Sequence, residues 1–308
     1  MNTTDKKNNL SSWITLIILT VIWGSSYILI KKGLVVFPPM QLASIRITFA
    51  FLALAGIAAY NFKKIPPKKR KIILIAGLAG NFFPAYLYAF AQTNVSSSIA
   101  GIINSLTPLF TLLIAVTIVK IKVTRLQMLG IFMGFTGCVG LSLVNNTGGL
   151  GQINLYFLLI VLATFLYGVN INLIKAKLSD IDSLLMTSCA MMFIGPFAIV
   201  YLLTTDFLTI TTQQPGGWEA LGYIALLGIT GTALALFLFN RLIQNTGPVF
   251  ASTVTYLMPV VALIWGVIDG EQLFPLHFVG MALIIFGVYI TNKRSRAQKI
   301  LKELQKPD

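Results

Sequence analysis

The sequence predicts an all-α integral membrane protein with ten transmembrane helices, arranged as two inverted five-helix repeats. Composition gives the first argument. The chain has 308 residues, of which 56% are hydrophobic and only 10% are charged, and its mean hydropathy is +0.83. A soluble protein of this size could not cover so much apolar surface, whereas lipid accepts it as solvent.

An internal repeat gives the second argument. Landmarks of the first half recur in the second half in the same order. The pairs are Trp23 and Tyr167, Gly24 and Gly168, Lys31 and Lys175, Pro108 and Pro259, Gly130 and Gly280, and Gly137 and Gly287. Because five spans is an odd number, the second copy must enter the bilayer from the other side. Inverted repeats that meet around a central site are typical of alternating-access transporters.

The predicted spans follow from apolar segments of about 17–25 residues, which suffice to cross a bilayer core roughly 30 Å thick. In the first half they lie near residues 13–30, 40–60, 72–91, 99–119 and 127–143. In the second half they lie near residues 155–174, 184–203, 221–242, 249–268 and 273–290. The first span lacks a small-x-small cleavage site, so we expect it to remain as a helix.

The predicted domain organisation has no separate soluble domain. Residues 1–145 form the first five-helix repeat, 146–151 an external hinge, 152–292 the second, inverted repeat, and 293–308 a basic cytoplasmic tail. The hinge is polar and rich in glycine. The tail alternates cations with apolar residues, so it is either a solvated segment or an amphipathic helix on an anionic leaflet.

Charge distribution predicts the orientation. The formal net charge is +14, and Lys and Arg gather at both termini and in loops that follow even-numbered spans. Loops after odd-numbered spans contain only Lys31 and Lys32. The positive-inside rule therefore places both termini in the cytoplasm. No basic domain with interleaved aromatic residues accompanies this charge, so we expect no nucleic-acid partner.

Several motifs together resemble a known family. They are Trp23-Gly24-Ser25-Ser26, Pro39 followed by Arg46, the segments around Pro108 and Pro259, Gly270-Glu271, and Gly280 with Gly287. In this order the chain is similar to EamA-type members of the drug/metabolite transporter superfamily over nearly its whole length. The resemblance implies paired five-helix repeats, small-solute transport, often export, and the plasma (inner) membrane of a prokaryote. One departure is that the first half has Lys120 and Lys122, and no acid, where the second half has Glu271.

Pro108 and Pro259 each fall about twelve residues into their spans, close to the bilayer midplane. A proline cannot donate to the carbonyl four residues earlier, so we expect both helices to kink there. The carbonyls of Asn104 and Thr255 should then be free. They could contact the solute, or the kinks could serve packing alone.

Arg46 is the charged side chain that lies unambiguously inside a predicted span, about 10 Å from its external end. Burying a guanidinium there costs a few kcal/mol, so it should face protein or water. It could attract an anionic or carboxylate group of the solute. It could also be a structural or gating ion that bonds helix-end carbonyls, which the resemblance favours.

Polar and aromatic residues inside the spans are the candidates for a substrate cavity. They are Trp23, Tyr27, Arg46, Tyr88, Asn104, Tyr167, Asn170, Asn240, Thr255 and Tyr256. A stripe of small residues, Ser97, Gly101 and Ser105, permits close helix contact. Internal packing explains this stripe better than contact with a second copy, and both a monomer and a homodimer remain possible.

The sequence argues against an enzyme. His277 is the single histidine, so a zinc motif with two histidines cannot form, and we expect neither metal nor cofactor. No GxSxG elbow and no GxxxxGK[ST] loop occurs. All nine acidic residues lie at ends or in loops, which disfavours proton-coupled cation exchange. Gradient-driven export of a small metabolite such as an amino acid is the first hypothesis, with organic-cation efflux and lipid handling as alternatives.

Overall fold

The computed structural model describes residues 10–119, 124–144, 148–150, 154–246 and 254–304. Every regular element in these ranges is a helix, and the only β feature among them is an isolated bridge between Val144 and Leu150. The chain therefore has the all-helical architecture that the sequence predicts.

The first half contains seven α-helical segments. They are α1 (Leu10–Leu34), α2 (Pro39–Asn61), α3 (Pro67–Gly77), α4 (Phe83–Ala91), α5 (Ser97–Ile103), α6 (Thr107–Val119) and α7 (Arg125–Ser142). The second half contains α8 (Tyr156–Lys177), α9 (Ser183–Leu203), α10 (Phe207–Gln213), α11 (Gly217–Gly228), α12 (Ala235–Thr246), α14 (Val254–Ile268) and α15 (Pro275–Leu304). Shorter turns join some of them: the 3₁₀ segments η1 (Phe62–Lys64) and η3 (Asn104–Leu106), and the π segments η2 (Leu78–Phe82) and η4 (Ile229–Leu234).

Seven helical stretches in the described residues are long and apolar enough to cross a membrane. They are Leu10–Leu34, Pro39–Lys64, Pro67–Ala91, Ser97–Thr117, Tyr156–Lys177, Ser183–Leu203 and Gly217–Leu242, and two shorter apolar helices cover Leu257–Ile268 and Pro275–Ile290. Large apolar side chains such as Phe132 and Phe197 are exposed on the outside of the bundle. Lipid is the solvent that such a surface requires, so the protein is a multi-pass membrane protein.

Local sequence signals position several helix starts. Proline occupies the first residue of α2 and of α3, where its missing N–H costs nothing. Thr124 and Gln127 form a capping box at the start of α7. The Asp182 carboxylate accepts hydrogen bonds from two backbone N–H groups of α9.

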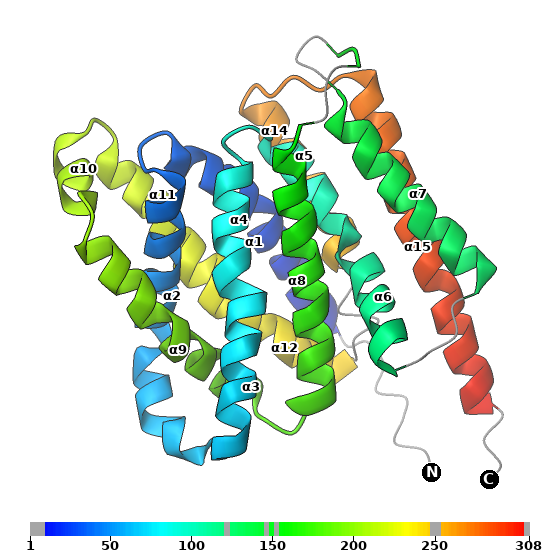
Figure 1. Ribbon diagram of the computed structural model, residues 1–308, viewed down its shortest axis with the longest axis horizontal. Coiled ribbons are helices and arrows are strands. Elements are labelled where there is room, and N and C mark those ends of the chain that lie inside the picture. Colours follow the sequence, from blue (N-terminus) through cyan, green and yellow to red (C-terminus); the bar gives the residue numbers. More distant parts are fainter. Residues whose placement is uncertain (1–9, 120–123, 145–147, 151–153, 247–253, 305–308) are drawn as a thin grey trace.

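Helices from the two halves interleave. Each of the following contacts joins a helix of the first half to one of the second: α1 packs on α14, α2 on α9, α4 and α6 on α8, and α7 along α15. Figure 1 shows α7 and α15 side by side. Glycine permits the closest approaches. A Cβ on Gly137 would lie 2.7 Å from the carbonyl oxygen of Gly280, and a Cβ on Gly287 would lie 2.5 Å from that of Gly130.

The small-residue stripe of the fourth predicted span serves internal packing, as expected. A Cβ on Gly101 would lie 2.5 Å from the Cβ of Ala262, so α5 and α14 meet without room for a larger side chain.

Other details differ from the sequence prediction. The loop over residues 206–217 contains the short helix α10, and the last helix continues to Leu304, through most of the predicted tail. The predicted hinge over residues 146–151 lies partly outside the described residues.

Candidate transport cavity

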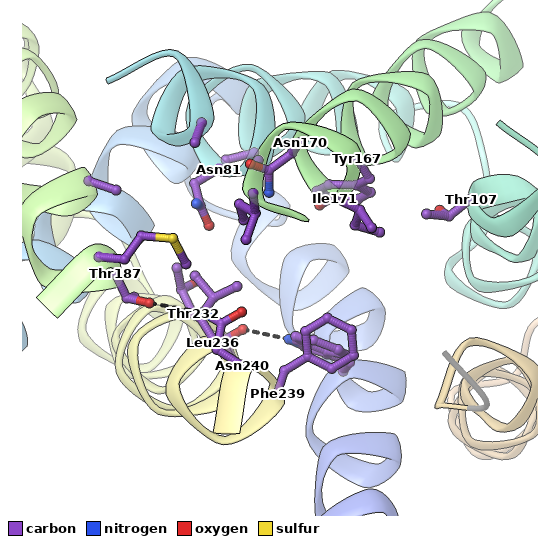
Figure 2. A pocket seen from close by; sticks show the side chains of 18 of the residues that line it. Asn81, Thr107, Tyr167, Asn170, Ile171, Thr187, Thr232, Leu236, Phe239 and Asn240 are labelled. Carbon is purple, nitrogen blue, oxygen red and sulfur yellow. Dashed lines mark hydrogen bonds between the residues drawn. The ribbon is translucent and has the colours of Figure 1, made fainter. Parts of the chain in front are cut away.

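A cavity of about 460 Å³ lies between helices of the two halves. From the first half its wall includes residues of α1, α2, α3, η2 and α4, together with η3 and α6. From the second half it includes residues of α8, α9, η4, α12 and α14. Figure 2 shows labelled side chains from η2, α8, α9, η4 and α12 around one shared space. The volume lies within the range of small-molecule sites.

The structure brings together nine of the ten candidate residues on this wall. They are Trp23, Tyr27, Arg46, Tyr88, Asn104, Tyr167, Asn170, Asn240 and Thr255. Tyr256 belongs to α14, but its side chain lies outside the described part of the chain. Pro108 is the second residue of α6 and Pro259 lies inside α14; neither contributes to the wall.

The expectation that the prolines leave two carbonyls free was wrong. The chain forms the 3₁₀ segment η3 just before Pro108, and the hydroxyl of Thr107 donates to the Asn104 carbonyl at 2.8 Å. The hydroxyl of Ser105 donates to the Thr255 carbonyl at 3.2 Å. Neighbouring side chains therefore satisfy both carbonyls, as buried backbone groups require.

Two π segments flank the cavity, and sequence reasoning missed them. η2 carries Gly80 and η4 carries Gly231, and both residues lie on the wall. A Cβ on Gly80 would clash with the Asn170 amide, and one on Gly231 would lie 3.1 Å from the Ser26 hydroxyl oxygen. In the sequence repeat Ser26 and Asn170 occupy the same position, so each π segment meets the corresponding helix of the other half. Segments of this kind often occur at functional sites.

The second π segment holds two cavity side chains by hydrogen bonds. The indole N–H of Trp23 donates to the Gly231 carbonyl at 3.0 Å. The Arg46 Nε donates to the Thr232 hydroxyl at 3.0 Å. Arg46 makes no ion pair within the described residues. Its hydrogen bond goes to a side chain of η4 and not to a helix-end carbonyl, and its role stays a prediction.

Beside the first π segment, η2, one buried polar atom lacks a hydrogen-bond partner in the described structure. The Oδ1 of Asn170 is buried without a hydrogen-bond partner in the described structure. Figure 2 shows Asn170 beside Asn81, and across the space from Thr187, Thr232 and Asn240. On that far side the Asn240 amide donates to the Thr187 hydroxyl at 3.2 Å. The side chains of Asn240 and Thr187 on the far side therefore bond to each other. On the near side, the Oδ1 of Asn170 is an acceptor to which no described group donates.

Aromatic rings form the apolar part of the wall. Trp23 and Phe239 meet edge to face with centroids 5.0 Å apart. Tyr88 lies 5.8 Å from Tyr27 and 6.3 Å from Tyr167, measured between ring centroids, and its hydroxyl donates to Asn104 Oδ1 at 2.8 Å. The rings present flat apolar surface while their polar ends are partly engaged.

The cavity reaches the surface at one end, which we call the mouth. Its rim consists of Lys175, Leu178, Ser179, Ile181 and Ser183, and Lys175 and Ser179 are exposed. These residues belong to the end of α8 and the connection to α9, at the lower edge of Figure 1.

At the other end, Ile30 is the last wall residue of α1 and directly precedes Lys31. Here the two halves are joined by a group that we call the Lys31 clamp: Lys31, Lys32, Ser97, Ser98, Asp269 and Glu271. Asp269 contacts Lys31 at 2.7 Å and Lys32 at 2.5 Å, and Glu271 contacts Lys31 at 3.0 Å. The Lys31 clamp connects α1, the start of α5 and the α14–α15 connection, at the upper edge of Figure 1.

The Glu271 carboxylate is the centre of the clamp. Its side chain is 4% exposed. Besides Lys31, it accepts from the backbone N–H groups of Ser97 and Ser98 at 2.8 and 3.0 Å and from their hydroxyls at 2.7 and 2.6 Å. Burial alone would raise the pKa of Glu271, but hydrogen bonds from Ser98, Ser97 and Lys31 outweigh it and lower the pKa to about 2. The carboxylate is therefore ionised at neutral pH.

Comparison with known proteins decides the family. The model of the EamA-like transporter family matches residues 11–143 and 154–293. The chain belongs to this family. The family resemblance proposed from the sequence is thus confirmed.

Relatives of this chain are named as transporters. An uncharacterized inner membrane transporter, YedA of Escherichia coli K12, is 28% identical over 283 residues, covering 88% of this chain and 87% of YedA. An uncharacterized transporter of Archaeoglobus fulgidus is 24% identical, covering 92% of this chain and 100% of the relative. A probable terminal-alkyne amino-acid exporter of Streptantibioticus cattleyicolor is 25% identical, covering 94% and 96%.

One solved structure, described only as the crystal structure of a protein, shares the fold. It has a TM-score of 0.60 and 15% sequence identity, and the match covers 94% of this chain and 98% of that chain. At this identity the likeness concerns the fold alone.

Proposed function

We propose that this protein is an alternating-access transporter that exports a small metabolite such as an amino acid. One observation carries the proposal: a cavity lined by both halves reaches exposed residues at the mouth, while the Lys31 clamp joins the halves at the other end. A site between two halves, accessible from one end, is what alternating access requires in one of its states.

The proposal includes ten spans in two inverted repeats, with residues 1–145 and 152–292 as the repeats, 146–151 as hinge and 293–308 as tail. Two contacts support the inverted relation. Gly137 meets Gly280, and Gly130 meets Gly287; replacing each glycine by its repeat partner turns one contact into the other. In the same way, the contact of Gly80 with Asn170 becomes the contact of Gly231 with Ser26.

The proposed orientation puts the mouth at the cytoplasmic side of a plasma membrane and the Lys31 clamp outside. It follows from the basic loops and the positive-inside rule. Cysteine labelling tests it. An impermeant reagent added to intact cells should label cysteines at positions 146 and 216 and miss those at 68 and 299. Labelling at 68 from the outside would reverse the orientation.

An amino acid is the proposed solute class because the cavity volume suits a small molecule, and because a relative is named a probable terminal-alkyne amino-acid exporter. Among the described residues, no Asp or Glu lines the cavity. We therefore expect flux in liposomes to persist without a pH gradient. A strict need for an imposed proton gradient would contradict this mechanism.

Variants of the wall test the site. Trp23→Ala or Asn170→Ala should lower solute flux in liposomes at least tenfold, because each removes a wall group, while thermal stability changes little. Leu158→Ala is the control, since Leu158 is 58% exposed on the outside of α8. Normal flux in both wall variants would show that solute passes elsewhere.

A further inference from the structure

The charges on the cavity wall are all of one sign. Within the part of the chain that the structure describes, Arg46 and Lys175 are its formally charged residues, and no carboxylate accompanies them. We propose that Arg46 binds a carboxylate group of the solute, so that the cavity selects solutes with a carboxylate and rejects amines that lack one. This inference rests on the proposed function and names the chemistry of its site.

Acidic side chains near the mouth are engaged elsewhere. Asp180 forms an ion pair with Lys69, and Asp182 caps the start of α9. At the other end Asp269 and Glu271 belong to the Lys31 clamp. An amine entering the cavity therefore finds two cations and no counter-ion, which opposes its binding.

The guanidinium of Arg46 is prepared for an anion. Its Nε donates to Thr232, and no acidic side chain in the described ranges pairs with it. The surrounding groups are the phenol rings of Tyr27, Tyr88 and Tyr167, which carry no charge at neutral pH. An unpaired charge inside a protein is costly, and a carboxylate can pair with the free edge of the guanidinium through two parallel hydrogen bonds.

The π segment η4 fixes the orientation of Arg46. The Thr232 hydroxyl accepts from Nε and lies 3.4 Å from the Leu227 carbonyl five residues earlier, to which it donates. Because the proton of the hydroxyl is donated to the preceding helix α11, its oxygen is directed at Arg46. Thr232 is therefore a positioning residue.

Asn170 supplies the complementary group. Its Oδ1 is a buried acceptor without a donor in the described structure. A solute that gives a carboxylate to Arg46 and an N–H or O–H group to Asn170 would satisfy both. Amino acids and hydroxy acids fit this pattern, whereas simple amines satisfy only Asn170.

Matched solutes test the proposal. The probes are phenylalanine, phenyllactate and phenethylamine, and leucine, its hydroxy acid and isoamylamine, which within each set share a side chain and differ in the carboxylate or amine. Binding to the purified protein in detergent is measured as a concentration-dependent rise in melting temperature. The acids of at least one set should stabilise the protein, and the two amines should not.

Variants assign the effect to Arg46. Arg46→Gln should weaken binding of the acids by about tenfold to a hundredfold, as expected for losing hydrogen bonds to a charged group. Arg46→Lys should restore part of it. Thr232→Val should weaken binding of the acids less than Arg46→Gln does. It takes the place of Arg46→Gln in this test if that variant does not fold. Arg241→Gln is the control, because Arg241 is exposed and does not line this cavity.

Three results would overturn the proposal: stabilisation by the amines equal to that by the acids, unchanged binding of the acids in Arg46→Gln, or no binding of any acid. Failure of the transport function gives a different result. Acids would then bind in an Arg46-dependent manner while liposomes show no flux of any probe.

Discussion

The two ends of the cavity differ in their ion pairs, although the sequence repeat places an equivalent lysine at each end. Lys31 and Lys175 occupy equivalent positions in the two halves. Lys31 lies in the clamp with Asp269 and Glu271, whereas Lys175 is exposed at the mouth and has no ion pair among the described residues. Acidic residues follow the predicted fourth span of the second half. At the corresponding place the first half has Lys120 and Lys122 and no acidic residue.

The difference teaches that two halves with matching sequence landmarks can be closed to different extents at their two ends. Glu271 is buried, and five donors compensate its desolvation. Removing any of them leaves the buried charge less well satisfied, so each donor contributes to the stability of the clamp. The mouth has no comparable group within the described residues. We therefore expect the state closed at the clamp and open at the mouth to dominate without solute.

The largest expected effect comes from Glu271→Gln, which removes the charge at the centre of the clamp. It should destabilise the closed end by roughly 3 kcal/mol, as for breaking a buried ion pair. A cysteine in place of Ser26, in a background with Cys138→Ala and Cys189→Ala, reports accessibility of the cavity. An impermeant thiol reagent outside should label it faster in the Glu271→Gln variant.

Glu219→Gln is the matched control for this prediction, since the Glu219 carboxylate is bonded to Tyr223 on the exposed face of α11. Equal labelling rates in the Glu271→Gln variant and in its parent would show that the clamp does not close the cavity.

A smaller effect should separate the two equivalent lysines. Lys31→Gln removes contacts to Asp269 and Glu271 and should lower stability by about 1 kcal/mol, because the side chain is partly exposed. Lys175→Gln should leave the melting temperature unchanged. Scanning fluorimetry of both variants checks this. Similar melting temperatures would mean that the two ends are held in the same way.

Gly80→Ala tests the first π segment with a still smaller expected loss of stability. The added methyl group would clash with the Asn170 amide and displace it from the wall. We expect flux to fall several-fold while the melting temperature drops less than in the Lys31→Gln variant. Gly222→Ala is the control, because nothing lies within 4 Å of its added Cβ. If Gly80→Ala kept full flux, Asn170 would not be a solute contact.

The smallest expected effect is that of pH. The folded-state pKa of Glu271 is about 2, below its ordinary value of 4.5. The contribution of the clamp is therefore fully present above about pH 5 and is lost as the pH falls through 4.5 toward 2. The labelling rate of any thiol rises with pH because the thiolate is the nucleophile. External labelling of the Ser26→Cys reporter is therefore divided by that of a small free thiol at the same pH, and this ratio should stay constant between pH 5 and 8. A rise in the ratio within that range would require a different titrating group at this end.

The sequence predicts much of this arrangement, because hydropathy and the repeat act over long stretches. Residues such as Trp23, Tyr167 and Asn240 could be proposed for the cavity because each is polar or aromatic at depth in a span. The helical fold and the family follow from the same signals.

Other features depend on contacts that no local pattern reveals. Glu271 meets Ser97 and Ser98 across more than 170 residues. The π segments at Gly80 and Gly231 look like ordinary apolar helix, since one extra residue per turn barely alters the pattern. The Thr255 carbonyl was expected to be free because its partner, Ser105, lies in the other half.

A reversible crosslink at the clamp end tests alternating access most directly. A Cβ on Gly266 would lie 3.1 Å from the Cβ of Ser98 and 2.6 Å from Glu271 Oε2. The Cβ atoms in a disulfide are about 3.5–4.5 Å apart, so the two helices need to separate only slightly to accept this crosslink. The double variant Ser98→Cys, Gly266→Cys, without the two native cysteines, can be oxidised and reduced in liposomes. We predict that oxidation abolishes flux of a transported solute and that a reductant restores it. Equal flux in the crosslinked and reduced protein would contradict the account, because the solute would then cross without opening this end.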